Sequence, residues 1–170
     1  MAEYTFTTPA GQTVARELLI AYLNTGTKAA PVWAAVGKRV EESSGEYDWS
    51  AESKQDILGN AYGNMKKPII TQAFDPCELD SGDPAQQKIW KLAVVDHDAQ
   101  ALSAQDMLIV HYYAGFAERY EACMVEVTSL GGEGGGSVGM PLNVTYGGTR
   151  TIGSATQKTD GSIEFTPAAA

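Results

Sequence analysis

The sequence predicts a mainly β protein, an antiparallel sandwich or barrel with one helix packed against it. Runs of strand length recur between turn signals, most clearly in Met107–Tyr113 and Val138–Tyr146. One segment, beginning at Asp83, carries the start signals of a helix. A long polar stretch, about 41–67, separates two strand-like segments. At 170 residues the chain is long enough for one domain with a sizeable core.

Two strands are expected in the N-terminal third. Arg16–Leu23 is almost continuously apolar and ends at Asn24-Thr25-Gly26, so we expect a strand that is covered on both faces. Val32–Val36 is predicted to be the next strand. Residues 1–14, rich in Thr, Ala, Gly and Pro, indicate an N-terminal arm.

A helix is predicted over about 84–97. Asp83 suits the N-cap, Pro84 suits the first helical position, and Gln86 falls three residues after the cap, as in a capping box. Apolar residues at helical spacing then predict a face that packs on the sheet. Losing the tryptophan from that contact is expected to cost about 3–5 kcal/mol. The helix-packing residues are Ile89, Trp90, Leu92 and Ala93.

The C-terminal half indicates strands. Met107–Tyr113 and Glu118–Thr128 suit an antiparallel pair. Val138–Tyr146 alternates apolar and other residues, Gly147-Gly148 is a hairpin signal, and Thr149–Thr156 is expected to return as the last strand. We therefore expect a single domain over 1–157 and a flexible tail over 158–170.

The polar stretch about 41–67 is predicted to be an arm between strands. Glu46–Ser50 alternates polar and aromatic residues and is expected to pair with Pro68–Phe74. Disordered tracts are poor in aromatic and aliphatic residues, which this arm contains, so we expect another chain to order it. The residues expected to make that contact are Glu42, Glu46, Tyr47, Trp49, Ile57, Leu58, Tyr62 and Met65.

Composition and charge exclude several classes. The formal net charge of −9 argues against tight nucleic-acid binding, since that affinity comes mainly from Lys and Arg. No apolar run approaches the ~20 residues of a membrane span, and the first residues lack a secretory signal, so we expect a cytoplasmic site of folding. Cys77 and Cys123 form no CxxC pair and are expected to be buried thiols.

Motifs for chemistry are missing from the sequence. The glycine-rich GGEGGG lacks both phosphate-loop spacings, and the sequence has no GxSxG or HExxH motif. The acidic cluster Asp75, Glu78, Asp80 and Asp83 lacks the order of a calcium loop. We therefore expect no catalytic residue, no metal and no cofactor.

Several stretches together resemble the major tail tube protein of long-tailed bacteriophages and related prophages. They are PIITQAFDP after an acidic arm, a capped helix that ends AVVDHDAQAL, MLIVHYYAGFAERYEACMVEV, and GGEGGG leading to MPLNVTYGGTRTIGSA. The resemblance covers about Leu18 to Ala155. It rests on the order and pattern of these segments rather than on a catalytic signature.

The resemblance implies a structural virion protein, not an enzyme. It implies hexameric rings that stack into a tube, whose lumen conducts double-stranded DNA. The net charge of −9 adds the expectation of an acidic lumen, along which DNA slides without specific binding. The arm would make the ring-to-ring contact, and the strands Val32–Val36, Pro68–Phe74, Gly139–Tyr146 and Arg150–Ala155 are the candidates for the lumen sheet. Implied partners are further copies of the chain, the tape measure protein and tail terminator or tip proteins, with no membrane. The implied location is the virion tail, assembled in the host bacterial cytoplasm.

Two other classes remain open at this point. A β-sandwich module that binds carbohydrate would need exposed aromatic residues gathered on one concave face, whereas the sequence scatters them. An acid–base hydrolase would need a pocket with carboxylates of perturbed pKa. A tailocin or contractile system also stays open within the tube interpretation.

Overall fold

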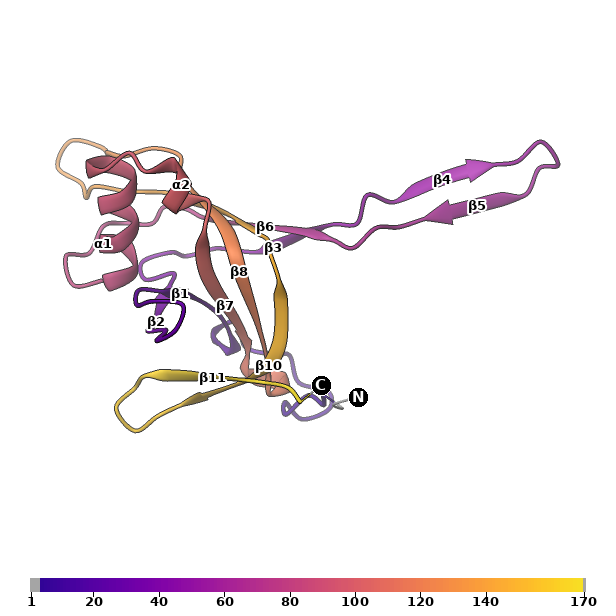
Figure 1. The fold of residues 1–170 in the computed structure, drawn as a ribbon, viewed down its shortest axis with the longest axis horizontal. Coiled ribbons are helices and arrows are strands. Elements are labelled where there is room, and N and C mark those ends of the chain that lie inside the picture. The colour runs from indigo at the N-terminus through magenta and orange to yellow at the C-terminus, as the bar shows by residue number, and fades with distance from the viewer. Residues whose placement is uncertain (1–3, 170) are drawn as a thin grey trace.

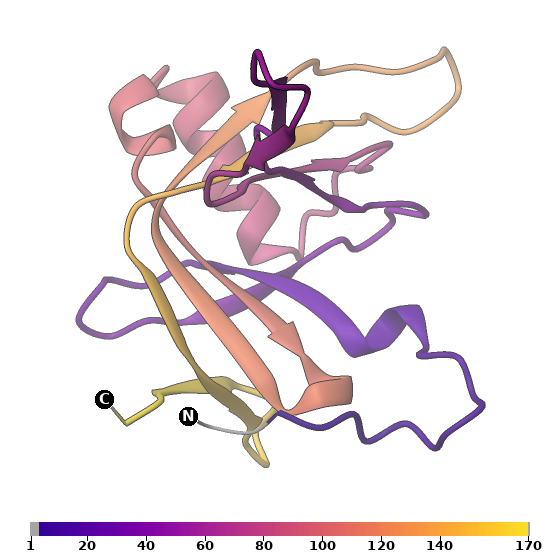
Figure 2. The same ribbon diagram turned by 90° about the vertical axis from the view of Figure 1, so that its right-hand side faces the viewer.

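The computed structural model describes residues 4–169, so the part of the predicted arm at Met1–Glu3 and the last residue of the predicted tail lie outside it. The described chain forms a curled nine-stranded antiparallel sheet with short helices at one end (Figures 1 and 2). The predicted fold class is confirmed. The main sheet runs in the order β2-β1-β7-β8-β9-β6-β3, and β10 and β11 join it through β8. Its strands are β1 (Leu19–Asn24), β2 (Trp33–Val36), β3 (Gly45–Asp48), β6 (Ile69–Phe74), β7 (Gln105–His111), β8 (Phe116–Val127), β9 (Leu142–Tyr146), β10 (Arg150–Gln157) and β11 (Ile163–Pro167).

The twelve-residue strand β8 organises the sheet. One of its edges pairs with β7, from His111↔Phe116 to Gln105↔Cys123. The register of this pairing shifts between Met107 and Gln105. Its other edge pairs first with β10 and then with β9. Beyond Cys123, β8 continues with β9 as its strand partner in the described chain, so its opposite edge is free of strands there.

The predicted hairpin at Gly147-Gly148 is wrong. β9 and β10 do not pair with each other, because both run antiparallel to β8 and follow one another along its edge. The two glycines make a bend, and Gly148 has φ of +77°. A Cβ there would lie 2.7 Å from Ala122 Cβ, so glycine is required by the close approach of β8.

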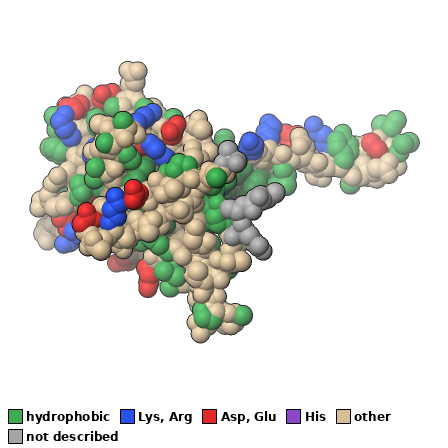
Figure 3. All heavy atoms as spheres, turned by 60° about the horizontal axis from the view of Figure 1, so that its bottom comes forward, with side chains coloured by type: hydrophobic (Ala, Val, Ile, Leu, Met, Phe, Trp, Pro, Cys, Tyr) green, Lys and Arg blue, Asp and Glu red, His purple; other side chains and the backbone are tan. Residues whose placement is uncertain are grey.

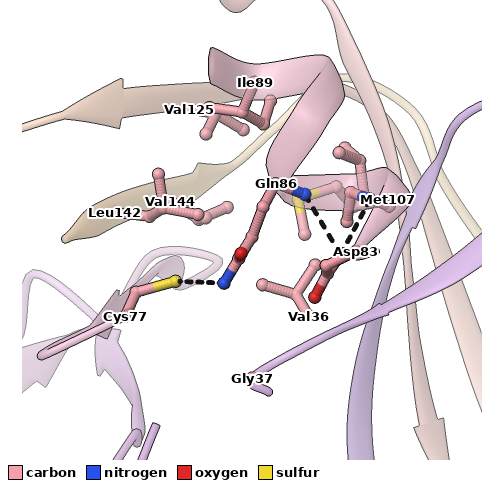
Figure 4. A pocket seen from close by; sticks show the side chains of 12 residues that line it. Val36, Gly37, Cys77, Asp83, Gln86, Ile89, Met107, Val125, Leu142 and Val144 are labelled. Atoms are coloured by element: carbon pink, nitrogen blue, oxygen red, sulfur yellow. Dashed lines mark hydrogen bonds between the residues drawn. The ribbon is translucent and has the colours of Figure 1, made fainter. Parts of the chain in front are cut away.

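The larger hydrophobic cluster lies on the sheet face that the helices cover. It joins strand residues such as Met107, Val125, Leu142 and Val144 to Ile89 from the helix (Figure 4). A second cluster, which includes Trp33, Leu108 and Ile163, lies on the opposite face beneath the β10–β11 hairpin. The sheet is therefore covered on different faces at its two ends.

The helical segment follows the sequence prediction closely at its start. α1 (Pro84–Trp90) has Asp83 as N-cap, whose side chain accepts hydrogen bonds from the backbone N–H groups of Ala85 and Gln86. The reciprocal half of the capping box is absent from the described structure, because Gln86 instead accepts from Asp80 N–H and donates to Glu78 O. The segment continues as a π-helical turn, η2 (Lys91–Val95), and a separate short helix α2 (Ala99–Leu102) follows.

Trp90 corrects the prediction of a helix face with four packed residues. Ile89 is buried, and Leu92 and Ala93 are partly buried. Trp90 is 39% exposed and lies beside Leu130 and Val138 on the outer side of α1. The prediction that Trp90 packs on the sheet is therefore wrong, because its side chain lies on the outer side of the helix.

The flexible C-terminal tail is also a wrong prediction. β11 pairs with β10 through five residues, and Ile163 is buried. The N-terminal arm is held at Thr7, whose N–H donates to Tyr113 O, and Phe6 packs edge-on against Tyr113. A 3₁₀ turn, η1 (Arg16–Leu18), then leads into β1, and another, η3 (Tyr112–Ala114), joins β7 to β8.

The strand predictions for β1, β2, β6, β7, β8 and β9 are confirmed to within a few residues. Cys77 and Cys123 are confirmed as buried free thiols. Within residues 4–169, no helix is long and apolar enough to cross a membrane.

Candidate assembly surface

The polar stretch between β2 and β6 is a β-hairpin that projects from the sheet (Figure 1). At its base β3 pairs with β6, from Gly45↔Gln72 to Asp48↔Ile69, which confirms the predicted pairing. Further out, β4 (Glu52–Gln55) pairs with β5 (Ala61–Asn64) as a separate two-stranded ribbon. From here on, the arm means residues 49–67, the projecting part of the predicted 41–67 stretch, which lies between the end of β3 and the start of β6. A hairpin satisfies its own backbone hydrogen bonds, which lets this segment leave the domain as a regular structure.

A kink separates the arm from the sheet. The Asp48 side chain accepts a hydrogen bond from Ser50 N–H, and Ser50 has φ of +45°. Opposite, Lys66 N–H donates to Trp49 O and holds the two sides together. The pairing is thus maintained across the kink while the strand direction changes.

The tip of the arm is a tightly bonded turn built on Asp56. One carboxylate oxygen accepts from Leu58 N–H and Asn60 N–H, and the other accepts from Asn60 Nδ2, all at 2.9 Å. These hydrogen bonds lower the pKa of Asp56, and the largest contribution comes from the side chain of Asn60. The turn presents two large aliphatic side chains to solvent: Ile57 is 102% exposed and Leu58 is 81% exposed.

The structure places most of the predicted contact residues on this hairpin. Tyr47 and Trp49 stack at its base, with ring centroids 6.3 Å apart, while Tyr62 and Met65 lie exposed on the returning side. Glu46 is an exposed residue of β3. Glu42 lies before β3 in the sequence, and its backbone forms an isolated antiparallel β-bridge with that of Asp75. Figure 3 shows apolar side chains at the far end of the arm and charged side chains along it. Ile57 and Leu58 are thus isolated from every other apolar cluster of the same chain.

A hollow of about 710 Å³ lies where the arm meets the sheet. Tyr47, Trp49, Phe116 and Tyr146 contribute to its wall. On its floor lies Glu118, which is only 3% exposed. This hollow brings together aromatic residues that are far apart in the sequence.

Glu118 is bound by three side chains. Arg150 Nε donates to one carboxylate oxygen at 2.7 Å, Tyr120 Oη donates to the same oxygen at 2.9 Å, and His111 Nε2 lies 3.1 Å from the other. Burial raises the pKa of Glu118, but the hydrogen bonds from His111, Arg150 and Tyr120 and the charge of Arg150 outweigh burial, so the net shift is downward. Glu118 is therefore held as a carboxylate, the reverse of what a general acid needs.

The Glu118 cluster was missed by the sequence analysis. Its residues lie on β7, β8 and β10, and Arg150 is 32 positions from Glu118. The sequence signal that could have indicated the cluster is the presence of the charged residues Glu118 and Arg150 inside strand-like segments. Within residues 4–169, no group of three or more His, Cys, Asp or Glu side chains is arranged to hold a metal ion.

Comparisons with known proteins show likeness at the level of structure. No family model matches the sequence, and no curated protein matches it significantly. A chain from the PVC sheath–tube complex of an extracellular contractile injection system, in its extended state, aligns with a TM-score of 0.50 at 6% identity, covering 85% of this chain and 94% of that one. A chain of the PVC sheath/tube terminator aligns at 0.48 with 9% identity (85% and 99% covered), and the tube-terminating cap of the anti-feeding prophage aligns at 0.47 with 13% identity (87% and 95% covered). The chain thus shares its fold with a component of a sheath–tube complex.

Proposed function

We propose that this protein is a structural subunit of a phage-tail-like tube, which assembles from rings of identical copies stacked end to end. The observation that carries the proposal is the arm, a folded hairpin that ends in Ile57 and Leu58 without apolar cover from its own chain. Exposed apolar residues on an ordered projection indicate a contact with another molecule. The fold shared with a chain of an injection-system sheath–tube complex supports the same conclusion.

In this proposal the arm makes the ring-to-ring contact. The charged side chains along it keep the free subunit soluble, and Ile57, Leu58, Tyr62 and Met65 become buried when a ring is available. The rings would be hexameric, as the resemblance to tail tube proteins implies. A long-tailed phage, a tailocin or a contractile injection system would each use such a tube.

The proposed cargo is double-stranded DNA that passes through without specific binding. A net charge of −9 gives a subunit that repels phosphates, so DNA would slide without being held. The tape measure protein and the tail terminator or tip proteins are the further partners proposed, and the virion tail, assembled in the host bacterial cytoplasm, is the proposed location.

Negative-stain electron microscopy of the purified protein over a concentration series tests this function. The full chain is expected to give rings and stacked tubes. In the matched variant, Ser50–Met65 is replaced by Asn-Gly, a two-residue turn that keeps β3 paired with β6 because Trp49 and Lys66 already lie side by side. This variant is expected to give rings without stacking. Single particles from the full chain at every concentration would refute the tube subunit.

One observation favours a second candidate function, carbohydrate binding. The hollow beside the arm gathers Tyr47, Trp49 and Phe116, the concave aromatic arrangement that a sugar-binding module needs. Tyr120 and Tyr146 in the same wall are buried, which leaves the stacked pair Tyr47 and Trp49 as the exposed platform. Glycan-array binding that is lost in Trp49→Ala, by a protein that stays monomeric, would establish this function in place of the tube.

A further inference from the structure

The hollow at the base of the arm has an aromatic wall that is open to solvent. Tyr47 and Trp49, which stack on each other, are exposed, and Phe116 contributes to the same wall. The volume of about 710 Å³ falls in the range of ~300–1,000 Å³ that is typical of sites that enclose a ligand. Aromatic side chains around a concave surface are common anchors of contacts between proteins. The hollow is therefore suited to receive a segment of another chain.

The paired ribbon keeps the tip of the arm away from the hollow of its own chain. β4 pairs with β5, and Lys66 N–H donates to Trp49 O, so both sides of the arm leave the sheet together. At the tip, the Asp56 carboxylate closes the turn by accepting hydrogen bonds from Leu58 and Asn60. Figure 1 shows the ribbon extended away from the sheet. An apolar tip that is held away from its own domain is available to a second copy.

The length of the arm determines how far it reaches into that second copy. From Trp49 to Ile57 an extended strand spans about 26 Å, at ~3.3 Å per residue. β6 leads from the base of the arm towards the helical end of the sheet, and its six residues span about 17–20 Å. In a head-to-tail stack, the helical end of one copy lies beside the arm base of the copy before it. The tip therefore passes the helical end and reaches the opposite end of the next copy, where that copy's hollow lies.

We infer that Ile57 and Leu58 of one copy fill the hollow at the base of the next copy's arm. This inference rests on the proposed function and names the surface that receives the arm. The occupant is the turn of a second copy, residues 56–60. Each arm base is then both the attachment of its own arm and the receptor for the arm of the preceding ring.

The apolar surfaces of the tip and the hollow suit each other. Ile57 and Leu58 present aliphatic side chains to solvent, and the stacked Tyr47 and Trp49 offer aromatic faces on which they can pack. The hydrogen bonds of the turn already fix the backbone between β4 and β5. A preorganised turn loses little conformational entropy when it docks, so more of the gain from burying the two side chains remains as affinity.

The charges of the tip and the hollow are also complementary. The tip carries the exposed carboxylate of Asp56, whereas Lys67 and Arg150 line the hollow. Among the described residues that line the hollow, Glu118 is the one carboxylate, and it is paired with Arg150 at 2.7 Å. Opposite charges on two surfaces favour their encounter and fix their orientation. A negative tip therefore meets a wall with cations.

The second apolar groove of the molecule fits the tip less well. It measures about 630 Å³ and lies at the helical end, beside Trp90, Leu130 and Val138. The arm enters the next copy at this end, so the groove would meet the base of the arm and not its tip. Among the described residues that line the groove, the charged one is Asp80, so it offers Asp56 no opposite charge. Reach and charge both select the hollow.

Photo-cross-linking in assembled tubes identifies the receiving surface. The photoreactive residue p-benzoylphenylalanine replaces Leu58 in the full chain, which keeps the tip apolar. Isotope-labelled and unlabelled copies are mixed, assembled and irradiated, and mass spectrometry shows which segments are joined and whether they belong to different copies. We expect cross-links between copies to residues 47–49, to residues 67–70 or to Phe116, and only in assembled samples.

The matched control for the cross-linking places the same photoreactive residue at Ser53. This position is exposed in β4 and lies about 13 Å short of the tip. It should therefore not label the segments that line the hollow.

A charge-based rescue tests the contact between tip and hollow independently. Leu58→Asp should weaken stacking, because a carboxylate replaces an apolar side chain. Adding Tyr47→Lys, on the wall of the hollow, should lower the protein concentration needed for stacking at least about tenfold relative to Leu58→Asp alone. The matched control adds Val138→Lys, in the groove beside Trp90, and should restore nothing. Leu58, Tyr47 and Val138 are all exposed, so the variants are expected to keep the fold.

The possible outcomes separate the receiving site from the tube function. Tubes whose cross-links fall outside the hollow, or rescue by Val138→Lys in place of Tyr47→Lys, would overturn the inferred site and leave the tube function intact. A sugar that still binds the hollow in assembled tubes, detected on a glycan array, would show that the tip does not fill it and would overturn the site as well. If the unmodified chain forms no rings, the proposed function fails and the inference fails with it.

Discussion

At the scale of single residues, the most consequential feature is the bound carboxylate of Glu118. It ties β10 to β8 through Arg150 and connects both to β7 through His111. An ionised carboxylate that is withdrawn from water is tolerated because each oxygen has a hydrogen-bonded partner. The cluster therefore links three strands at the end of the sheet that is distant from α1.

We expect the stability of the protein to depend on the ionisation of Glu118. The pKa of Glu118 is lowered in the folded state, so its contribution is fully present above the unfolded pKa of about 4.3 and is lost as pH falls through the folded pKa. Glu118→Gln should lower the free energy of unfolding at pH 7 by about 1.5–3 kcal/mol. It should also flatten the dependence on pH below about 4.3. Urea unfolding between neutral and acidic pH measures both effects.

The control for this prediction is Glu121→Gln, which removes a carboxylate from the same strand. It should leave the unfolding free energy at pH 7 nearly unchanged. Equal losses in the two variants would mean that net charge, and not the Glu118 cluster, sets the stability.

Gly148 is a second residue on which the fold depends, because it forms the bend between β9 and β10. Gly148→Ala should destabilise the fold by at least about 1–3 kcal/mol, because φ of +77° is unfavourable for alanine and the new Cβ would lie 2.8 Å from Ala122 N. Gly134→Ala, in the open GGEGGG loop, meets nothing within 4 Å and should change stability by less than about 0.5 kcal/mol. Thermal and urea unfolding of the two variants compare the positions directly. A neutral Gly148→Ala would show that the bend can relax.

At the scale of elements, α1 shows which part of a helical pattern determines packing. The cap at Asp83 and the buried Ile89 fix the helix on the sheet, whereas Trp90 faces outward. The segment then winds into the π-helical turn η2, so residues after Trp90 no longer follow the spacing of an α-helix.

Paired substitutions in α1 test this arrangement. Ile89→Ala should cost about 2–5 kcal/mol, as expected for a buried branched side chain. Trp90→Ala should cost about 1–2 kcal/mol, because part of the ring already contacts water. The ratio of the two losses, measured by urea unfolding, is the decisive quantity. A larger loss at Trp90 would contradict the exposed position of its side chain.

At the scale of the whole molecule, the stability of the domain does not depend on the side chains of the projecting arm. The domain has its clusters on both faces of the sheet, whereas every residue of β4 and β5 is exposed. The fold can therefore tolerate changes in the arm that the proposed ring-to-ring contact would not tolerate.

The double substitution Ile57→Asp with Leu58→Asp separates these requirements. Both side chains are fully or largely exposed, so the unfolding free energy of the monomer should change by less than about 0.5 kcal/mol. If the proposed function holds, stacking of rings should be lost, because charged residues would replace the apolar side chains of the proposed contact. Sedimentation velocity and electron microscopy measure assembly, and urea unfolding measures stability.

The matched control adds the same charge elsewhere on the arm, as Ala51→Asp with Ser53→Asp. It should retain stacking, although more weakly at low salt if the contact surface is acidic. Loss of stacking in both variants would assign the effect to charge in general and not to the aliphatic tip.

Local sequence patterns determined much of this protein. The cap and first turn of α1, the strand character of β1, β2 and β6 to β9, the burial of both cysteines and the pairing of β3 with β6 all follow from short-range signals. The polar, aromatic-bearing stretch between β2 and β6 likewise indicates an arm by its composition alone. These features depend on periodicity, capping and turn residues, which neighbouring positions encode.

Only the tertiary structure decided how the elements meet. It turned Gly147-Gly148 into a bend, because the long strand β8 offered one continuous edge to both β9 and β10. It ordered the residues around Ile163 by giving them β10 as a partner, and it gathered Glu118, His111 and Arg150 from three strands. Pairing between strands distant in the sequence depends on which edges are free once the sheet has formed, and no local pattern records that.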